Sequence, residues 1–356
     1  MITRFYTFLL FVLCPFVVFP SIFINEMMVK NVSNHVNGNF NFEGWVELYN
    51  SGTDSINLSN YYFSDDQGNP LLWQYQGDMD IAPGGFAIFY FDELDSENHS
   101  SFKLDSDGGI LILNDEAGNL VDYINYPEPL RNTSYGRLTD GGDVIGFLSS
   151  SSFAASNNDA AQITSQTTPP LFSHVGGFYS TPISVEITAS NTAAKIYYTT
   201  DGSEPTSSSA LYNSPIQISK TTPLRAIAMV NGEASSLVST ATYFVATENI
   251  PTNVKVVSLS TDKDYVHGDS MGILIVGKNG LTVPSKCGSM DRKANYMQDW
   301  DRPCNLELYD EAKTPQINQE VKIGVFGACS RTKAIKSLKV KANKTFGNNK
   351  LNYPIF

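Results

Sequence analysis

Short strand-like runs separated by turn residues are the feature that most constrains this chain. Between residues 22 and 245, runs rich in β-branched and aromatic residues repeatedly end at Gly, Pro, Asn or Asp. Over residues 22–146 no convincing amphipathic helical pattern accompanies them. Spacing of this kind predicts β-sandwiches, so we expect a mainly β protein. Clear examples are the runs at 44–49, 85–90, 109–113, 183–187 and 195–203.

Length and composition limit the class of protein further. The 356 residues leave room for two or three compact units at about 150 residues per domain. A mean hydropathy of -0.16 and 12% aromatic residues exclude a disordered chain. A net charge of -12 and a pI near 4.8 argue against general nucleic-acid binding, which requires a basic surface.

The N-terminal segment indicates the compartment. Arg4 precedes an apolar run over residues 5–19. A basic residue followed by an apolar stretch of this length is typical of a secretory signal peptide, which we place at residues 1–21. An uncleaved anchor helix is the alternative. Both interpretations predict a secreted or cell-envelope protein that meets the membrane only through this segment.

Charge divides the rest of the chain in two. Residues 22–250 hold 26 acids and 7 bases, a balance of -19, whereas residues 251–356 hold 10 acids and 16 bases, a balance of +6. This asymmetry predicts separate modules with different partners. Linkers are expected at residues 147–168, rich in Ser, Ala, Asn and Thr, and at residues 246–253, which contain Pro251.

Several kinds of chemistry lack support in the residues. Beyond the signal the chain has three cysteines, Cys287, Cys304 and Cys329, so at least one thiol is free or has a partner outside the chain. They form no CxxC pair that would suggest a zinc or redox site. The chain contains no GxSxG, no HExxH and no persuasive carboxylate pair, which argues against a hydrolase acting on glycans.

The first module, residues 22–146, carries an ordered set of motifs. They lie at 23–26, 45–50, 56–59, 63–66, 81–85, 102–104, 118–122 and 134–137. This module resembles the lamin tail domain, an immunoglobulin-like sandwich, and the resemblance implies an accessory or adhesion role. We expect Trp45 in its core. The acids at 65–66 and 105–107 are interpreted as solvated turns, with calcium binding as the alternative.

The second module, residues 169–245, contains the string YYTTDGSEP at 197–205, together with motifs at 177–179 and 224–226. The set resembles the small β-sandwich at the C-terminus of chitobiases and β-hexosaminidases, which is not the catalytic part of those enzymes. The resemblance therefore implies a spacer or a carbohydrate-associated role.

The basic third module, residues 254–356, is similar to the N-terminal part of the CotH protein-kinase family, a secretory kinase fold. The matching strings lie at 294–303, 305–309, 327–331, 336–338 and 352–356. We expect a partial, β-rich α+β lobe here.

That resemblance suggests nucleotide-binding residues: Ser330, Arg331 and Lys336. We expect residues 324–327 to form a flexible loop whose amides approach phosphates. A strand over 335–342 would place Lys336 inward on the face of Leu338 and Val340, where a kinase fold has its phosphate-contacting lysine. A strand-end lysine reaching solvent is the alternative.

The strand pattern also makes a prediction about two neighbouring lysines. Lys339 and Lys341 would point away from Lys336 and are expected to be solvated.

Together these patterns predict an exported multidomain surface protein with accessory binding modules and an incomplete, non-catalytic CotH-like segment. In the family, the acids that hold the metal lie beyond the string at 352–356, so we expect no catalytic residue, metal or cofactor in this chain. The alternative is the N-terminal fragment of a secreted kinase that uses ATP and magnesium. The expected partner is a cell-surface protein or glycan.

Overall fold

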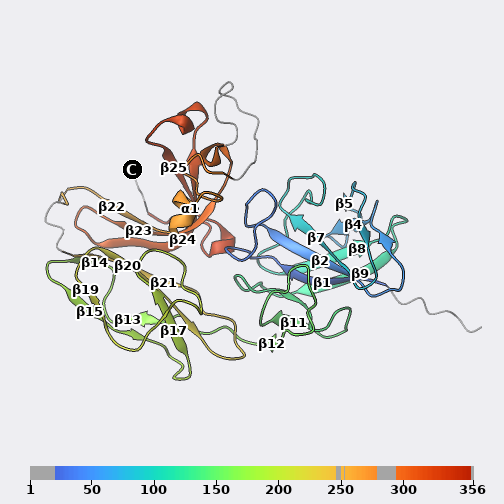
Figure 1. Cartoon of the computed structure of the whole chain (residues 1–356), viewed down its shortest axis with the longest axis horizontal. Coiled ribbons are helices and arrows are strands. Elements are labelled where there is room, and N and C mark those ends of the chain that lie inside the picture. Colours follow the sequence, from blue (N-terminus) through green and yellow to red (C-terminus); the bar gives the residue numbers. More distant parts are fainter. Residues whose placement is uncertain (1–20, 246–249, 252, 279–293, 354–356) are drawn as a thin grey trace, which may run out of the picture.

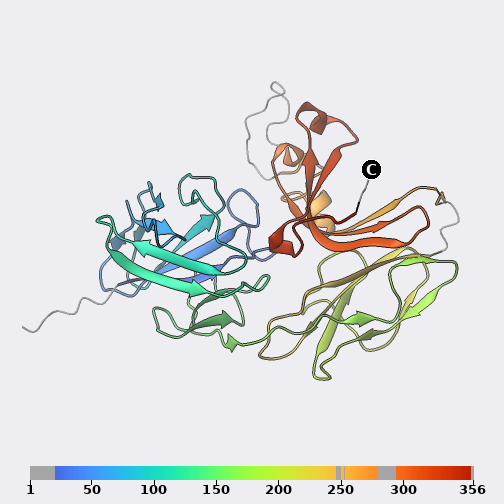
Figure 2. The ribbon, with the colours of Figure 1, turned by 180° about the vertical axis from the view of Figure 1, so that it is seen from behind.

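The computed structural model describes residues 21–245, 250, 251, 253–278 and 294–353. It contains three β modules (Figure 1), and the third lies across the second and reaches the first. The view from behind shows the same arrangement (Figure 2). The expectation of a mainly β protein is confirmed. None of the helices in these residues is long and apolar enough to span a membrane, and the predicted signal peptide falls almost entirely outside the described part.

The first module is a sandwich. One sheet has the order β12-β11-β10-β1-β2-β7, the other β5-β4-β8-β9, and β3 pairs with β6. The strands are β1 (Ile22–Met28), β2 (Gly44–Asn50), β3 (Ile56–Asn57), β4 (Tyr62–Ser64), β5 (Trp73–Gln74), β6 (Asp80–Ile81), β7 (Phe86–Phe91), β8 (Gly109–Asn114), β9 (Leu120–Tyr126), β10 (Tyr135–Arg137), β11 (Ile145–Leu148) and β12 (Gln162–Ile163).

Alternating side chains of the two sheets meet in the core of this sandwich. In β7, residues 87, 89 and 91 are buried while the residues between them are less so, as the period of two requires. Phe63 from the other sheet lies 4.8 Å from Phe89, measured between ring centroids. Trp45 is fully buried, as predicted, although it faces Phe153 with the rings 5.0 Å apart.

The segment expected as a linker at 147–168 is part of the first module over most of its length. Strand β12 pairs with β11 in the main sheet. Asn157 is fully buried, and its amide donates to the carbonyls of Asn25 at 3.2 Å and Arg137 at 2.7 Å. The Ser and Asn side chains of this segment therefore form buried hydrogen bonds. Composition alone does not distinguish such a packed segment from a solvated linker.

The second module is also a sandwich. Its larger sheet has the order β14-β21-β20-β17-β18, and β13-β16 and β15-β19 form the opposing layer. The strands are β13 (Leu171–Phe172), β14 (Gly177–Tyr179), β15 (Ile183–Val185), β16 (Ile187–Thr188), β17 (Lys195–Thr199), β18 (Ala210–Leu211), β19 (Ile216–Ile218), β20 (Thr222–Met229) and β21 (Ser239–Val245).

The conformation of the turn after β17 requires a glycine at position 202. Gly202 has a φ of +89°, which disfavours other residues. A Cβ at this position would also lie 2.9 Å from the backbone oxygen of Thr261 in the third module. The glycine in the YYTTDGS string therefore permits close contact between two modules.

The third module has one sheet of order β22-β23-β24-β25. The expected linker before it, 246–253, lies largely outside the described residues. The elements are β22 (Val256–Ser260), α1 (Lys263–His267), η1 (Asn295–Met297), β23 (Arg302–Tyr309), β24 (Pro315–Phe326), η2 (Cys329–Thr332), β25 (Ser337–Lys341) and η3 (Lys344–Phe346).

The structure corrects two local predictions in this module. Residues 324–326 are the end of strand β24 and pair with β25, so the predicted phosphate loop is reduced to a turn at Gly327, which has a φ of +107°. Lys336 precedes β25 instead of lying within the strand. The glycines at 324 and 327 suggested a loop, but pairing with β25 holds Gly324 in an extended strand conformation.

Buried carboxylates hold the 149–158 segment in the first module and make its stability depend on pH. Glu47 is fully buried and accepts hydrogen bonds from the Asn25 side chain at 3.1 Å and the Ala154 backbone at 2.7 Å. Burial is the main cause that raises the pKa of Glu47 from 4.5 to about 8, and Glu26 and Asp140 raise it further.

We predict that the first module loses stability between pH 5 and pH 9. The folded state binds the Glu47 proton more tightly than the unfolded state, so this contribution is full below about pH 4.5 and is lost as the pH rises through 8. Glu47→Gln, which carries no titrating group, should flatten the dependence, and the exposed Glu128→Gln should not. Hydrogen exchange of the β1 and β2 amides against pH measures this; an unchanged slope in Glu47→Gln contradicts the prediction.

Candidate functional site

Four charged side chains from three modules meet at one point. Arg131, between β9 and β10, forms ion pairs with Glu204 of the second module, at 3.2 Å, and with Glu320 on β24. Arg225 on β20 approaches the same Glu320 carboxylate at 3.6 Å. We call Arg131, Glu204, Arg225 and Glu320 the charge cluster; it is a shared contact of all three modules.

Burial makes the cluster energetically important. The side chains of Arg131, Arg225 and Glu320 are 8%, 5% and 13% exposed. Arg225 also donates to the Gly202 carbonyl at 3.0 Å. Burial lowers the pKa of Arg225, while the nearby Glu204 acts in the opposite direction. Removing one member of such a group leaves a buried charge without a counter-ion, which costs much more than loss of a surface pair.

A second buried carboxylate joins the second and third modules. Glu307 on β23 accepts hydrogen bonds from the backbone N–H of Thr242 at 3.0 Å and from the Tyr309 hydroxyl at 2.9 Å, and the Thr242 hydroxyl donates to it as well. The Tyr309 ring packs edge-on against Phe178 and Phe244. The two sheets are therefore joined by both polar and aromatic contacts.

The string at 294–303, part of the CotH resemblance, contacts the first module. The Trp300 indole donates to the Asn39 carbonyl at 2.6 Å, and the guanidinium of Arg302 donates to the Phe40 carbonyl at 2.9 Å. Arg302 is fully buried, and burial lowers its pKa to about 10. Two residues of this string thus act at an interface between modules.

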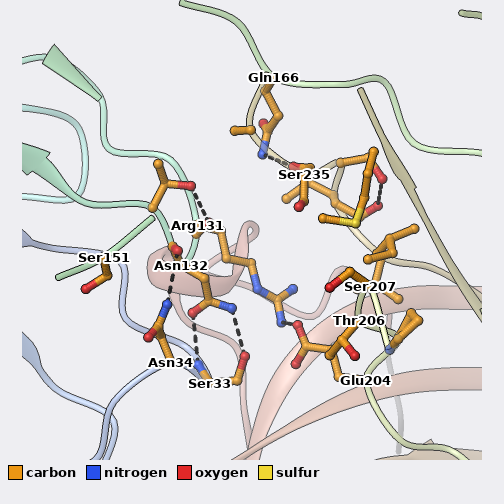
Figure 3. Close-up of a pocket in the computed structure, with 18 of the residues that line it drawn as sticks. Ser33, Asn34, Arg131, Asn132, Ser151, Gln166, Glu204, Thr206, Ser207 and Ser235 are labelled. Carbon is orange, nitrogen blue, oxygen red and sulfur yellow. Dashed lines mark hydrogen bonds and ion pairs between the residues drawn. The ribbon is translucent and has the colours of Figure 1, made fainter. Parts of the chain in front are cut away.

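A cavity of about 670 Å³ opens beside the charge cluster, where the first and second modules face each other (Figure 3). Arg131 and Asn132 project into it from the first module, and Glu204 meets Arg131 from the second. Asp262 and Tyr265 of the third module complete the lining. About half of the lining residues are Ser, Thr, Asn or Gln. This cavity is the candidate functional site.

The wall of the cavity is ordered by its own hydrogen bonds. The side chain of Asn132 accepts from the backbone N–H groups of Val32 and Ser33 at 2.8 and 3.0 Å and donates to the Ser33 hydroxyl at 2.7 Å. On the opposite wall Gln166 donates to the Ser235 carbonyl at 3.1 Å. The cavity is thus built from loops that are tied in place on both sides.

The three predicted nucleotide-binding residues lie together at one end of the third sheet. Ser330 and Arg331 are in η2, and Ser330 is exposed. The guanidinium of Arg331 donates to the carbonyls of Gly327 at 2.7 Å and Gln298 at 2.8 Å. The Lys336 ammonium donates to the Lys333 carbonyl at 3.0 Å and lies 4.4 Å from the centre of the Tyr296 ring.

The prediction for the neighbouring lysines is half right. Lys341 is 54% exposed in its side chain, as expected, although it pairs with Asp301 at 3.3 Å. Lys339 is only 15% exposed and forms ion pairs with Asp299 at 2.9 Å and Asp301 at 3.0 Å. The period-two pattern gives the direction of a side chain but not the acids that another segment brings to it.

Cysteines and carboxylates in the described residues suggest no metal chemistry. Cys304 is buried with a free thiol, and burial raises its pKa to about 12. Cys329 is disulfide-bonded, while Cys287 lies outside the described residues. No group of three or more His, Cys, Asp or Glu side chains is placed there to hold a metal ion. Asp66 and Asp105 instead accept local backbone hydrogen bonds, as turn residues do.

No single sequence motif brings together the residues of the charge cluster. The usable signal was composition: residues 22–250 contain 26 acids and only 7 bases, so each arginine there is surrounded by potential partners. That signal marks Arg131 and Arg225 as notable. It does not select Glu204 and Glu320, because those contacts depend on how the modules pack.

Fold and site together define a mostly β protein whose first two modules are sandwiches that face each other across a polar cavity. Residues 19–128 match the family model described as Lamin Tail Domain, and residues 174–240 match that of the chitobiase/beta-hexosaminidase C-terminal domain. Both resemblances predicted for these segments are confirmed. Neither match extends into the third module.

Comparisons with whole proteins add little. No curated protein matches the chain. Among solved structures, the chain is similar to one described as the fibronectin(III)-like modules of Clostridium thermocellum CbhA, with 12% identity over 58% of this chain and 87% of that chain. The TM-score is 0.20, so this likeness carries no argument.

We predict that Glu320→Ala separates the third module from the other two. The substitution leaves Arg131 and Arg225 buried without this counter-ion, and breaking a buried pair of this kind costs about 3–5 kcal/mol. Small-angle scattering should show a larger radius of gyration, and hydrogen exchange should rise in β24. Glu311→Ala, an exposed glutamate in the β23–β24 turn, is the matched control. Equal scattering from both variants would show that the cluster does not hold the modules together.

Proposed function

We propose that the protein is an exported accessory protein of the cell envelope or extracellular space, which binds a cell-surface protein or glycan and catalyses no reaction. The observation that carries this proposal is the way the buried charged groups are used. Arg131, Arg225 and Glu320 hold modules together beside a cavity. An arrangement that fixes binding loops relative to one another suits recognition.

Two further observations support a role outside the cell. The resemblance of two modules to the Lamin Tail Domain and to the chitobiase/beta-hexosaminidase C-terminal domain implies accessory roles, and the N-terminal residues have the composition of a signal peptide. We propose that the third module serves as a structural support. Its residues Trp300, Arg302 and Glu307 are engaged by the neighbouring modules.

Export through the N-terminal segment can be tested directly. Charged residues in the apolar run, for example Leu9→Arg with Leu10→Arg, should retain the full chain inside the cell, because a charge in this region opposes membrane insertion by about 2.5–3.5 kcal/mol. Fractionation with a specific antibody measures the distribution. Leu9→Val with Leu10→Val keeps the run apolar and should be exported normally. Export of the arginine variant at the normal level would contradict the proposed location.

A second candidate function is that of the front part of a CotH-type kinase. In its favour, Ser330, Arg331 and Lys336 gather at one end of the sheet, beside the turn at Gly327. Against it, Arg331 is engaged by backbone carbonyls and the Lys336 ammonium lies on an aromatic ring. Both groups would have to leave these partners to contact a phosphate.

We therefore predict no phosphoryl transfer and no ATP binding by this chain. Calorimetric titration with ATP and Mg²⁺ should give no saturable heat, and incubation with labelled ATP should label neither the chain nor added casein. Binding that disappears in Lys336→Met but persists in Lys333→Met, an exposed lysine of the same turn, would favour the kinase candidate instead.

A further inference from the structure

We propose that the cavity between the first and second modules binds a neutral oligosaccharide. This inference rests on the proposed binding role and names its site and ligand class. The volume of about 670 Å³ lies within the range of about 300–1,000 Å³ that is usual for small-molecule sites.

Unpaired hydroxyl groups point to the kind of ligand. The hydroxyls of Ser150, Ser207 and Ser235 line the cavity and have no protein hydrogen-bond partner among the described residues; Ser150 and Ser207 are exposed, so their hydroxyls are available to a ligand. Ser150 comes from the first module and the other two from separate loops of the second. A hydroxyl both donates and accepts, so such a set suits a ligand that presents many hydroxyl groups over an extended surface.

The charges of the lining disfavour an anionic ligand. Arg131 is the one cation in the lining, and Glu204 and Glu320 already pair with it. Two further carboxylates, Glu233 and Asp262, also line the cavity. An acidic ligand would meet more negative than positive charge, which disfavours it relative to a neutral ligand.

Apolar side chains complete the match. Ile227, Met229 and Leu237 line the cavity together with the hydroxyl groups. A sugar ring presents C–H groups on its faces and hydroxyls around its edge, so it can use both parts of this lining. A purely apolar ligand would leave the hydroxyl groups desolvated without partners, which is unfavourable.

Binding should also join the modules more tightly. The walls come from residues 33–34, 131–133 and 148–151 of the first module and from residues 204–207 and 227–238 of the second. A ligand that touches both walls binds the docked arrangement better than the separated one, and therefore stabilises it by linkage.

The test is calorimetric titration of the full chain with neutral tetrasaccharides of glucose, N-acetylglucosamine and mannose, and with anionic tetragalacturonate. We expect saturable binding of at least one neutral probe, and affinity for the anionic probe at least about tenfold lower. Ser207→Trp, which fills the cavity, should weaken the binding by about tenfold or more. Ser208→Trp is the matched control: this neighbouring serine is exposed like Ser207 but does not line the cavity, so its variant should bind within about twofold of the unaltered chain.

Three results would overturn the inference. They are absence of binding to every neutral probe, equal or better binding of tetragalacturonate, and equal effects of the two tryptophan variants. The inference and the proposed function can fail separately. If the exported chain binds no glycan probe but attaches to cells through a protease-sensitive partner, the inference is wrong and the proposed function stands. Phosphoryl transfer or failure of export removes the proposed function itself.

Discussion

The architecture depends on how one arginine is neutralised. The Arg131 side chain projects from the first module and forms ion pairs with one carboxylate of each other module, Glu204 and Glu320. A buried guanidinium is expensive without counter-ions, so its desolvation is offset only when all three modules are docked. Arg225 shares Glu320 and extends the requirement to the face of the larger sheet of the second module that points away from its core. The charge cluster thus couples the placement of the modules, and the cavity follows from that placement.

The charge asymmetry of the chain has a different meaning in the folded protein. Some acids of the front part interact with bases of the C-terminal part. The Lys344 ammonium lies 2.6 Å from Asp107 of the first module. Half-buried Glu43 and Lys322, also on different modules, shift each other's pKa toward the charged forms, although desolvation is the larger effect for both and acts in the opposite direction. The uneven distribution of charge along the chain therefore contributes to attraction between modules, and it does not by itself indicate a charged external ligand.

Polar residues that look like connectors or motif remnants have structural roles here. The 149–158 segment supplies backbone N–H groups to Glu26 and Glu47, carboxylates that lie opposite each other in the pairing of β1 with β2. Arg331, proposed from the family resemblance as a nucleotide contact, donates to backbone carbonyls at the end of β24. Both cases follow from the same rule: donors and acceptors removed from water must be paired, and several of the partners, such as Gln298 for Arg331 and Ala154 for Glu47, lie far away in sequence.

The sequence by itself determined the class and the units. Period-two patterns and turn residues are local, so they predicted a first sandwich with Trp45 buried and a second β-rich module, whose sandwich fold was implied by the family resemblance. The third β-rich unit could be placed as well, because its strands show the same local signals. Only the tertiary structure decided that residues 149–163 pack into the first module and that Gly324 lies in a strand. It also decided the ion pairs of Lys339 and the ion pair between Arg131 and Glu320. These features depend on contacts between residues that are distant in the chain, and no local pattern encodes which distant group will arrive to neutralise a charge or pair a strand edge.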